Sequence, residues 1–295
     1  MHVHGYPDVG LDWKMRTDDL TMVRLARDSG LGGIVLKSHF WPTMDRALIL
    51  NQRLNAPDFE VYGSITLNHL VGGVSPMAVE AAALHGARVV FMPTWGSRND
   101  HGHGGVVRRE IIDRVLPTFG PRLEAGALTV VDGNGNLQPE AGDVLAVAKE
   151  YSLVVSTGHV SVEESLAIAG VAAEIGHDKL IFGHPFSRSV QADPAVMREM
   201  ADRGAVIEMT HTHTVMADPP ARIVDIYGAV VALGPGRVIL TTDVFFPWQP
   251  PQAESFRMFV GQLRDQGCSD EDLRTMVVRN PARLLATAQG TAGGA

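Results

Sequence analysis

The stretch Gly33-Ile34-Val35-Leu36-Lys37-Ser38-His39, with the helical pattern from Thr43 to Leu54 behind it, contains the unit from which this chain is built. A short run of branched apolar residues followed by a longer amphipathic segment is typical of a buried parallel strand and its crossover helix. The run ends on Lys37 and His39, which are two residues apart and therefore share one face of the strand. The same order recurs along the whole chain.

Eight such units predict the fold. The expected strands are Met1 to His4, Gly33 to His39, Val61 to Leu67, Arg88 to Met92, Leu153 to Thr157, Lys179 to Phe182, Ala205 to Met209 and Val238 to Thr242. A helical segment follows each strand, and the tail adds one more from Asp270 to Val278, where Ser269 and Asp272 form a capping box. Eight βα units predict an α/β fold, the closed (β/α)8 TIM barrel. A doubly wound sheet is disfavoured because no Gly-rich phosphate-binding motif follows any of these strands.

The amino-acid composition excludes several classes of protein and several kinds of partner. With 295 residues, 45% of them hydrophobic and 20% charged, we expect one globular domain over residues 1–295. The net charge is −8 and no run of Lys or Arg stands out, so neither nucleic acid nor an anionic membrane is an expected partner. The single Cys268 excludes an internal disulfide and a thiolate-rich zinc cluster. We find no secretion signal or membrane-spanning stretch, and we expect a cytoplasmic protein.

Residues 93–136 break the regular pattern. The segment is rich in Gly and contains one short helical piece near Arg108 to Val115. We interpret it as an elaborated loop after the fourth strand that can act as a lid, because long irregular inserts in compact domains are usually functional. His101 and His103 are assigned to this loop, and His85 and His177 are predicted to be surface residues.

Ligand-type side chains lie where strands end. His2 and His4 share a face of the first strand, His159 and His184 follow the fifth and sixth strands, and Asp243 follows the eighth. In a TIM barrel these strand ends meet at one rim. Imidazoles and a carboxylate gathered there suit a divalent metal ion with positions left open for water and substrate.

The residues beside these candidates support the same interpretation. Gly158 and Gly183 directly precede His159 and His184, and we expect both glycines to bend the backbone so that the imidazoles face the barrel mouth. A bound divalent ion lowers the pKa of its water, and Asp243 is placed to accept the proton.

The ordered set His2, His4, His159, His184 and Asp243 resembles the pattern of the amidohydrolase superfamily, which has His-x-His on strand one, single His residues on strands five and six, and Asp on strand eight. The segment Val278-Arg279-Asn280-Pro281-Ala282-Arg283-Leu284-Leu285 is similar to a helix that follows strand eight in that family. The resemblance spans nearly the whole chain. It implies a metal-dependent hydrolase in which activated water attacks an amide, cyclic amide, lactone or ester bond of a small molecule.

The chain departs from the family at a lysine. Members with two metal ions usually carry a bridging carboxylated Lys on strand four, where this chain has Phe91-Met92-Pro93-Thr94. A buried amine can react with CO2 to give an anionic carbamate. One hypothesis is that Lys37 on strand two takes the bridging role, with His159 and His184 holding a second ion. The equal alternative is that Lys37 stays cationic and binds a substrate carboxylate. The expected cofactor is thus one or two divalent ions, with zinc first and manganese or iron also suitable.

Further residues at the strand ends are candidate substrate contacts. The predicted contacts are His39, His69, Trp95, Arg188, His211 and His213. The aromatic residues Trp41, Trp95, Phe245, Phe246 and Trp248 predict an apolar pocket wall suited to a hydrophobic or ring-bearing substrate. Glu208, inside the seventh strand, is predicted to orient a ligand His.

Two other functions stay open. Similar barrels can be non-oxidative decarboxylases of aromatic or unsaturated acids, with one metal ion and an unmodified Lys37, and release of CO2 without consumption of water would identify that reaction. The other is a metal-binding or ligand-binding barrel without turnover, for which a proton acceptor such as Asp243 has no use. In each case the expected partner is a small molecule, and the chain could form a homo-oligomer.

Overall fold

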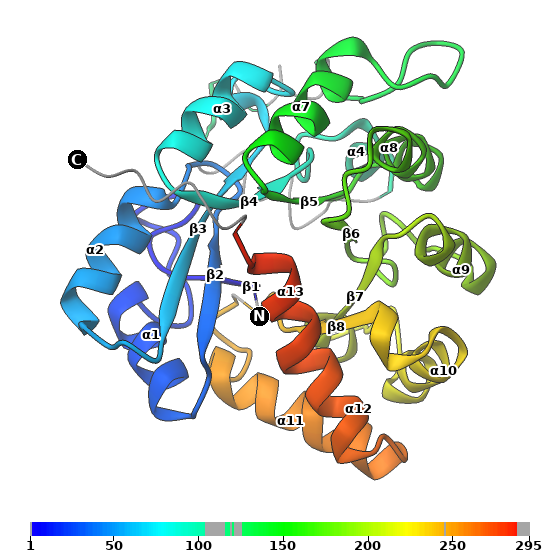
Figure 1. The fold of residues 1–295 in the computed structure, drawn as a ribbon. Coiled ribbons are helices and arrows are strands. Elements are labelled where there is room, and N and C mark those ends of the chain that lie inside the picture. The colour runs from blue at the N-terminus through cyan, green and yellow to red at the C-terminus, as the bar shows by residue number, and fades with distance from the viewer. Residues whose placement is uncertain (1, 104–115, 119, 121–125, 245, 288–295) are drawn as a thin grey trace.

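The computed structural model describes residues 2–103, 116–118, 120, 126–244 and 246–287. Eight parallel strands pair in chain order to form a nearly closed barrel inside a ring of helices (Figure 1). They are β1 (His2–His4), β2 (Gly33–Lys37), β3 (Glu60–Thr66), β4 (Ala87–Phe91), β5 (Val154–Ser156), β6 (Leu180–Phe182), β7 (Val206–Thr210) and β8 (Val238–Thr241). The predicted TIM barrel is confirmed, and each predicted strand agrees with an observed one to within two residues at either end.

The helices lie around the barrel. They are α1 (Asp19–Asp28), α2 (Met44–Leu54), α3 (Pro76–Leu84), α4 (Arg98–Gly102), α7 (Pro139–Glu150), α8 (Val162–Ile175), α9 (Pro194–Asp202), α10 (Ile223–Leu233), α11 (Gln252–Gln266), α12 (Asp270–Arg274) and α13 (Asn280–Leu285). The predicted capping box of Ser269 and Asp272 is present at the start of α12. The helix predicted from Asp270 to Val278 continues further in the structure, because a π-helical turn (Thr275–Arg279) joins α12 to α13. Helix α13 crosses the end of the barrel (Figure 1).

The barrel closes between its first and last strands. In β1, His4 pairs with Lys37 of β2 in a regular parallel register. On its other side β1 meets β8 through separate hydrogen bonds. The backbone N–H of His2 donates to Thr241 Oγ1 at 2.7 Å, and the N–H of Asp243 donates to the carbonyl oxygen of His2 at 3.3 Å. This closure brings the first strand of the chain into contact with the last one.

The barrel interior is apolar below the strand ends. Its buried layer consists of Val35, Val89, Phe91, Val154, Ile181, Val206, Ile239 and Leu284. A small, mostly apolar pocket that is partly open to solvent lies between this layer and α13, and His2 and Glu208 also line it. Polar groups at the top of the barrel therefore rest on a region of low polarity, where an unpaired charge is costly.

The long loop after β4 is tied down at its base. Arg98 N–H donates to Leu128 O at 2.7 Å, and Leu128 N–H donates to Gly96 O at 2.8 Å. The expected helical piece from Arg108 to Val115 lies outside the described residues. Within the part of the chain that the structure describes, no helix combines the length and apolar character of a membrane span.

One surface prediction is wrong. His85 is exposed as expected, but His177 is buried after the last turn of α8, where its N–H donates to Ala172 O at 2.8 Å. Its Nε2 has no hydrogen-bond partner among the described residues. Burial, aided by Lys179 and Lys149 against the opposing charge of Asp178, lowers the pKa of His177 to about 4.

This burial predicts a pH-dependent stability. A His whose pKa falls from 6.5 to about 4 on folding takes up a proton more readily when unfolded, so its contribution is present above pH 6.5 and lost as the pH falls toward 4. We expect the free energy of unfolding of His177→Gln to fall less between pH 7.5 and pH 5 than that of the wild type, by about 1–2 kcal/mol. Urea unfolding at both pH values measures this difference, and equal losses in the two proteins would contradict the assignment.

Candidate metal centre

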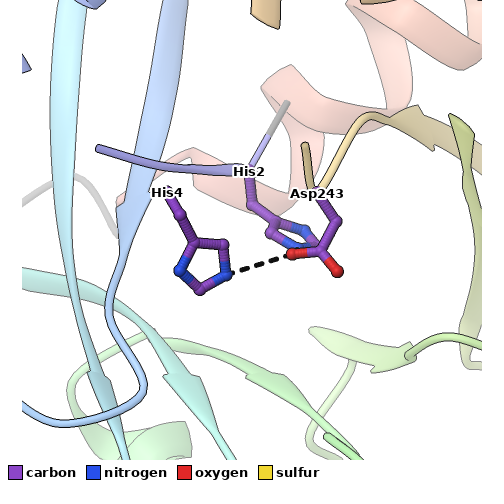
Figure 2. A group of neighbouring side chains, drawn as sticks. All are labelled: His2, His4 and Asp243. Carbon is purple, nitrogen blue, oxygen red and sulfur yellow. Dashed lines mark hydrogen bonds and ion pairs between the residues drawn. The ribbon is translucent and has the colours of Figure 1, made fainter. Parts of the chain in front are cut away.

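Three predicted ligands from the two ends of the chain meet at the barrel mouth. Nε2 of His2 lies 2.9 Å from Asp243 Oδ1, and Nε2 of His4 lies 3.1 Å from the same oxygen (Figure 2). All three side chains are buried, and their ligand atoms lie within 4.8 Å of one another. Two imidazole nitrogens and one carboxylate oxygen thus converge as a three-ligand metal site requires.

His184 lies beside this group at the end of β6. Its Nε2 is 3.5 Å from Lys37 Nζ, which is itself 3.9 Å from Asp243 Oδ1. Its Nδ1 faces the other way, at 3.9 Å from Glu208 Oε2 and 3.9 Å from Asp243 Oδ2. His2, His184 and Glu208 form a second set of ligand atoms within 4.8 Å of one another.

His159 stands at the edge of the centre. Its ring centroid lies 5.0 Å from that of His184, and its Nδ1 is 3.2 Å from Asp100 Oδ1. It belongs to neither of the two sets of ligand atoms.

The backbone turns at two of these residues. His184 has φ = 52° and Asp243 has φ = 49°, a left-handed conformation that is uncommon outside glycine and that gathers at functional sites. Gly158 also bends as expected, with φ = 65°. The prediction for Gly183 is wrong, because the turn lies at His184 itself. Gly183 serves instead to avoid a collision, since a Cβ there would lie 2.7 Å from Ser156 Oγ.

A carboxylate stands behind each of the first two imidazoles. His2 Nδ1–H donates to Glu208 Oε1 and His4 Nδ1–H donates to Asp8 Oδ2, each at 2.7 Å. Such bonds fix the tautomer and direct Nε2 toward a shared point. The role predicted for Glu208 agrees with this geometry. Asp8 was not predicted from the sequence, and the only signal is an acidic residue four positions after His4.

Asp8 is itself held in place. It accepts a hydrogen bond from the Ser38 hydroxyl and another from the backbone N–H of His39 at 3.3 Å. Both donors follow β2, so the loop after β2 fixes the carboxylate that orients His4. This arrangement explains the polar run Lys37-Ser38-His39, of which only the outer two residues were predicted to face the site.

The charges of the centre fit a divalent cation. Asp8, Glu208 and Asp243 are buried carboxylates, and Lys37 is a fully buried amine, so three formal negative charges face one positive charge and leave −2. An uncompensated buried charge is costly, and a divalent ion would remove it. Imidazole and carboxylate ligands of this kind suit zinc, manganese or iron.

The pKa shifts at the centre have the same origin. Burial alone would lower the pKa of His2, but the carboxylates of Glu208 and Asp243 outweigh it and raise that pKa above its usual value. Burial alone would raise the pKa of Asp243, but Lys37 and His2 hold it well below its usual range. Asp243 is therefore an anion at neutral pH.

Two of the predicted substrate contacts border this group as an aromatic stack. The ring of His39 lies between His4, at 4.6 Å, and Trp95, at 3.7 Å, measured between centroids. The Thr94 hydroxyl lies 2.9 Å from His39 Nδ1, and Asn68 Nδ2 donates to the carbonyl oxygen of His39 at 2.9 Å. Burial, followed by the charge of His4, lowers the pKa of His39 well below its usual value. Asn68 was not predicted from the sequence.

His213 is the third candidate that borders the centre. Its ring lies 5.8 Å from that of His184, and it is buried. Burial lowers its pKa to about 4, so the imidazole is neutral at pH 7. Its Nδ1 has no hydrogen-bond partner among the described residues.

The other three candidates lie elsewhere. His211 Nδ1 accepts from the Ser255 hydroxyl at 2.7 Å while its Nε2 donates to Gln262 Oε1 at 3.2 Å, so the ring faces α11. His69 Nε2 donates to Gly126 O at 2.8 Å, and Arg188 pairs with Asp218 in an exposed position. Partners within the protein therefore hold these three side chains apart from the centre.

The predicted aromatic wall is partly exposed. Trp41 and Trp248 are 58% and 56% exposed, and Trp248 stacks on Phe246 at 5.2 Å. Phe245 lies outside the described residues. Exposed tryptophans beyond the strand ends leave apolar surface for a ligand to cover.

This chain matches one protein family and has a fold similar to that of several solved structures. The model of a family described as "Family of unknown function (DUF6282)" matches residues 1–208. Curated proteins give no significant match. The fold is similar to that of an amidohydrolase from Pseudomonas aeruginosa, with a TM-score of 0.64 and 10% identity over 96% of this chain and 94% of that one.

Two further solved structures are similar over nearly their full length. An amidohydrolase from Burkholderia multivorans with bound zinc has a TM-score of 0.56 and 14% identity, covering 97% of this chain and 98% of that one. An organophosphorus hydrolase from Deinococcus radiodurans has a TM-score of 0.57 and 15% identity, covering 97% and 91%. Because these sequence identities are low, the similar structures confirm the resemblance to the amidohydrolase superfamily for the fold alone.

The hydrogen bond from His4 to Asp8 predicts a measurable effect on metal binding. In Asp8→Asn the carboxylate that orients His4 is lost, and we expect the affinity of the metal-free protein for Zn²⁺ to fall roughly 10- to 100-fold. Asp12→Asn, a change in an exposed residue of the same loop, is the matched control. Titration against a chelator of known affinity measures both, and an unchanged affinity in Asp8→Asn would refute the positioning role.

Proposed function

The chain belongs to the family of unknown function DUF6282, and we propose that it is a metal-dependent hydrolase of the amidohydrolase type. The observation that carries the proposal is the convergence of His2, His4 and Asp243, from the first and last strands, with the imidazoles facing one carboxylate oxygen. We propose these three residues as the ligands of a divalent ion. His184, Lys37 and His159 would border the reacting groups.

In the proposed reaction the metal ion activates water and substrate, and the protein transfers the proton. A bound divalent cation polarises a substrate carbonyl and makes water acidic enough to lose a proton near neutral pH. Asp243 Oδ1 faces the two imidazoles, so its other oxygen, Oδ2, is left to accept that proton. Because the pKa of Asp243 is held well below its usual range, the carboxylate is ionised at neutral pH and Oδ2 carries no proton of its own. It then returns the proton to the leaving group.

Neutral imidazoles can bind the substrate. His213 is uncharged at pH 7, its ring lies beside that of His184, and its Nδ1 has no hydrogen-bond partner among the described residues. As an N–H donor it would stabilise the negative charge that develops on the carbonyl oxygen during attack. The stack of His39 and Trp95 would form one wall for an apolar or ring-bearing group.

The substrate class is proposed from the site and from similar structures. The aromatic surface favours small molecules with a ring or an apolar chain. Among similar structures, one is described as an organophosphorus hydrolase and another as engineered from a lactonase template. A panel of lactones, cyclic amides, aryl esters and phosphotriesters, assayed with Zn²⁺ and with Mn²⁺, is the direct test.

The role of Asp243 gives a second test. On whichever substrate is turned over, we expect Asp243→Asn to lower kcat roughly 10²- to 10⁴-fold, because the amide cannot accept the proton. The amide oxygen can still face the metal, so metal content is measured on the same samples. Unchanged kcat in a variant that retains its metal would refute the proton-transfer role of Asp243.

The state of Lys37 separates two versions of the chemistry. As a carbamate it would bridge two ions, whereas as an ammonium it would bind a substrate carboxylate, as the alternative decarboxylase reaction requires. Lys37 is fully buried and its Nζ lies between His184 Nε2 and Asp243 Oδ1, a position that suits either role.

Labelling decides between these versions. For the bridging version we expect metal-loaded protein in ¹³C-bicarbonate to give a carbamate carbon signal that is absent from Lys37→Met. If wild type and variant give the same spectrum, Lys37 is unmodified. Turnover of aromatic acids to CO2 would then be assayed as the alternative reaction.

A further inference from the structure

The side-chain amide of Asn68 joins the loops that follow three neighbouring strands. Asn68 is buried after β3, and its Oδ1 accepts hydrogen bonds from the backbone N–H groups of Thr94 at 2.9 Å and Gly96 at 3.1 Å, both after β4. Its Nδ2 donates to the carbonyl oxygen of His39, after β2, at 2.9 Å and to Thr94 Oγ1 at 2.8 Å. These bonds fix the orientation of the amide, because the reverse orientation would set its two donors against two backbone N–H groups.

The orientation of this amide decides which nitrogen of His39 carries a proton. The Thr94 hydroxyl has one proton to donate, and its oxygen accepts the bond from Asn68 Nδ2. Thr94 is fully buried, and the only other partner of its hydroxyl among the described residues is His39 Nδ1, at 2.9 Å. Because an unsatisfied buried donor is costly, the hydroxyl donates to Nδ1. A ring nitrogen that accepts a hydrogen bond carries no proton, so His39 is a neutral imidazole with its proton on Nε2.

We propose that Asn68 is a positioning residue that acts through Thr94 to fix His39 as the Nε2–H tautomer, and that His39 thereby offers the substrate a hydrogen-bond donor. The contact with substrate rests on the proposed function, whereas the tautomer does not. The His39 ring lies between the rings of His4, at 4.6 Å, and Trp95, at 3.7 Å, and this stack limits its rotation. Both the direction and the protonation of the imidazole are therefore set by the protein.

A fixed donor selects the chemistry of the substrate. Thr94 already occupies Nδ1 of His39, so a group that binds this imidazole at Nε2 must be a hydrogen-bond acceptor. The carbonyl oxygen of a lactone, ester or amide and the phosphoryl oxygen of a phosphotriester meet this requirement. An ammonium group does not, because two donors would then oppose each other. The preferred substrate thus places an oxygen acceptor beside the aromatic wall that His39 and Trp95 form.

Ring ¹⁵N NMR of metal-free protein with labelled histidine measures the tautomer directly. The signals of His39 are those that disappear in His39→Gln, and we expect the wild type to show a protonated Nε2 and an unprotonated Nδ1. Asn68→Asp keeps an acceptor for the two backbone N–H groups but replaces the donor with an oxygen, which then accepts from the Thr94 hydroxyl. His39 must then donate through Nδ1, so we expect the two ring nitrogens to exchange roles.

Three further variants separate this role from a structural one. Asn51→Asp makes the same change in an amide that bonds to the backbone N–H and carbonyl oxygen of Val61, and it should leave the His39 tautomer unchanged. Thr94→Ser retains the hydroxyl and should also keep the proton on Nε2. Thr94→Val removes the hydroxyl, and we expect a mixture of both tautomers, a result that does not depend on whether Asn68→Asp folds.

Kinetics test the contact with substrate. On whichever substrate is turned over, we expect Asn68→Asp to lower kcat/KM roughly tenfold, which is the usual effect of losing one neutral hydrogen bond. Thr94→Val should lower kcat/KM less, because part of the population keeps the donor. Thr94→Ser should match the wild type.

The other outcomes each contradict one part of the proposal. A wild type with the proton on Nδ1 of His39 overturns the assigned tautomer. A proton on Nε2 in both the wild type and Asn68→Asp overturns the role of Asn68. A change of tautomer with an unchanged kcat/KM overturns the contact with substrate. Absence of turnover throughout the substrate panel contradicts the proposed function, while the NMR signals of His39 still decide the role of Asn68.

Discussion

The contact between β1 and β8 is the constraint on which the rest of this structure depends. β1 has only three residues, and it is held by the ladder to β2 on one side and by two backbone donors on the other. One of those bonds joins the backbone of Asp243 to that of His2. The hydrogen bond that closes the barrel therefore also sets two proposed metal ligands side by side, and the site cannot form in a barrel that is open at this edge.

Electrostatics explains why the centre needs its surroundings. Carboxylates at Asp8 and Glu208 direct the two imidazoles of β1, and a third carboxylate at Asp243 lies between them. These groups rest on an apolar interior with a pocket toward α13. The charged side chains are themselves buried, so solvent does not balance them, and that balance falls to Lys37 and, in the proposed function, to a bound cation.

Several features of the site come from backbone conformation rather than from residue type. The left-handed turns at His184 and Asp243 follow strands β6 and β8 and turn each side chain over the barrel mouth. The sequence pattern suggested Gly183 as the flexible point, because glycine favours such turns. Instead, a neighbouring strand requires the glycine, since only a missing Cβ avoids Ser156. A contact between β5 and β6 cannot be read from the residues of β6 alone.

By itself the sequence determined the barrel, its strands and the proposed ligands at strand ends, because alternation of side chains along a strand and the order of βα units are local properties. Only the tertiary structure decided which His residues share a centre. His211 and His213 are two residues apart, yet one faces α11 and the other borders His184, because the 3₁₀ turn after β7 sends their rings in different directions. Likewise Asp8 acquires its role from a bond to His4 and a loop after β2. Such partners are set by packing between distant segments, which no local pattern encodes.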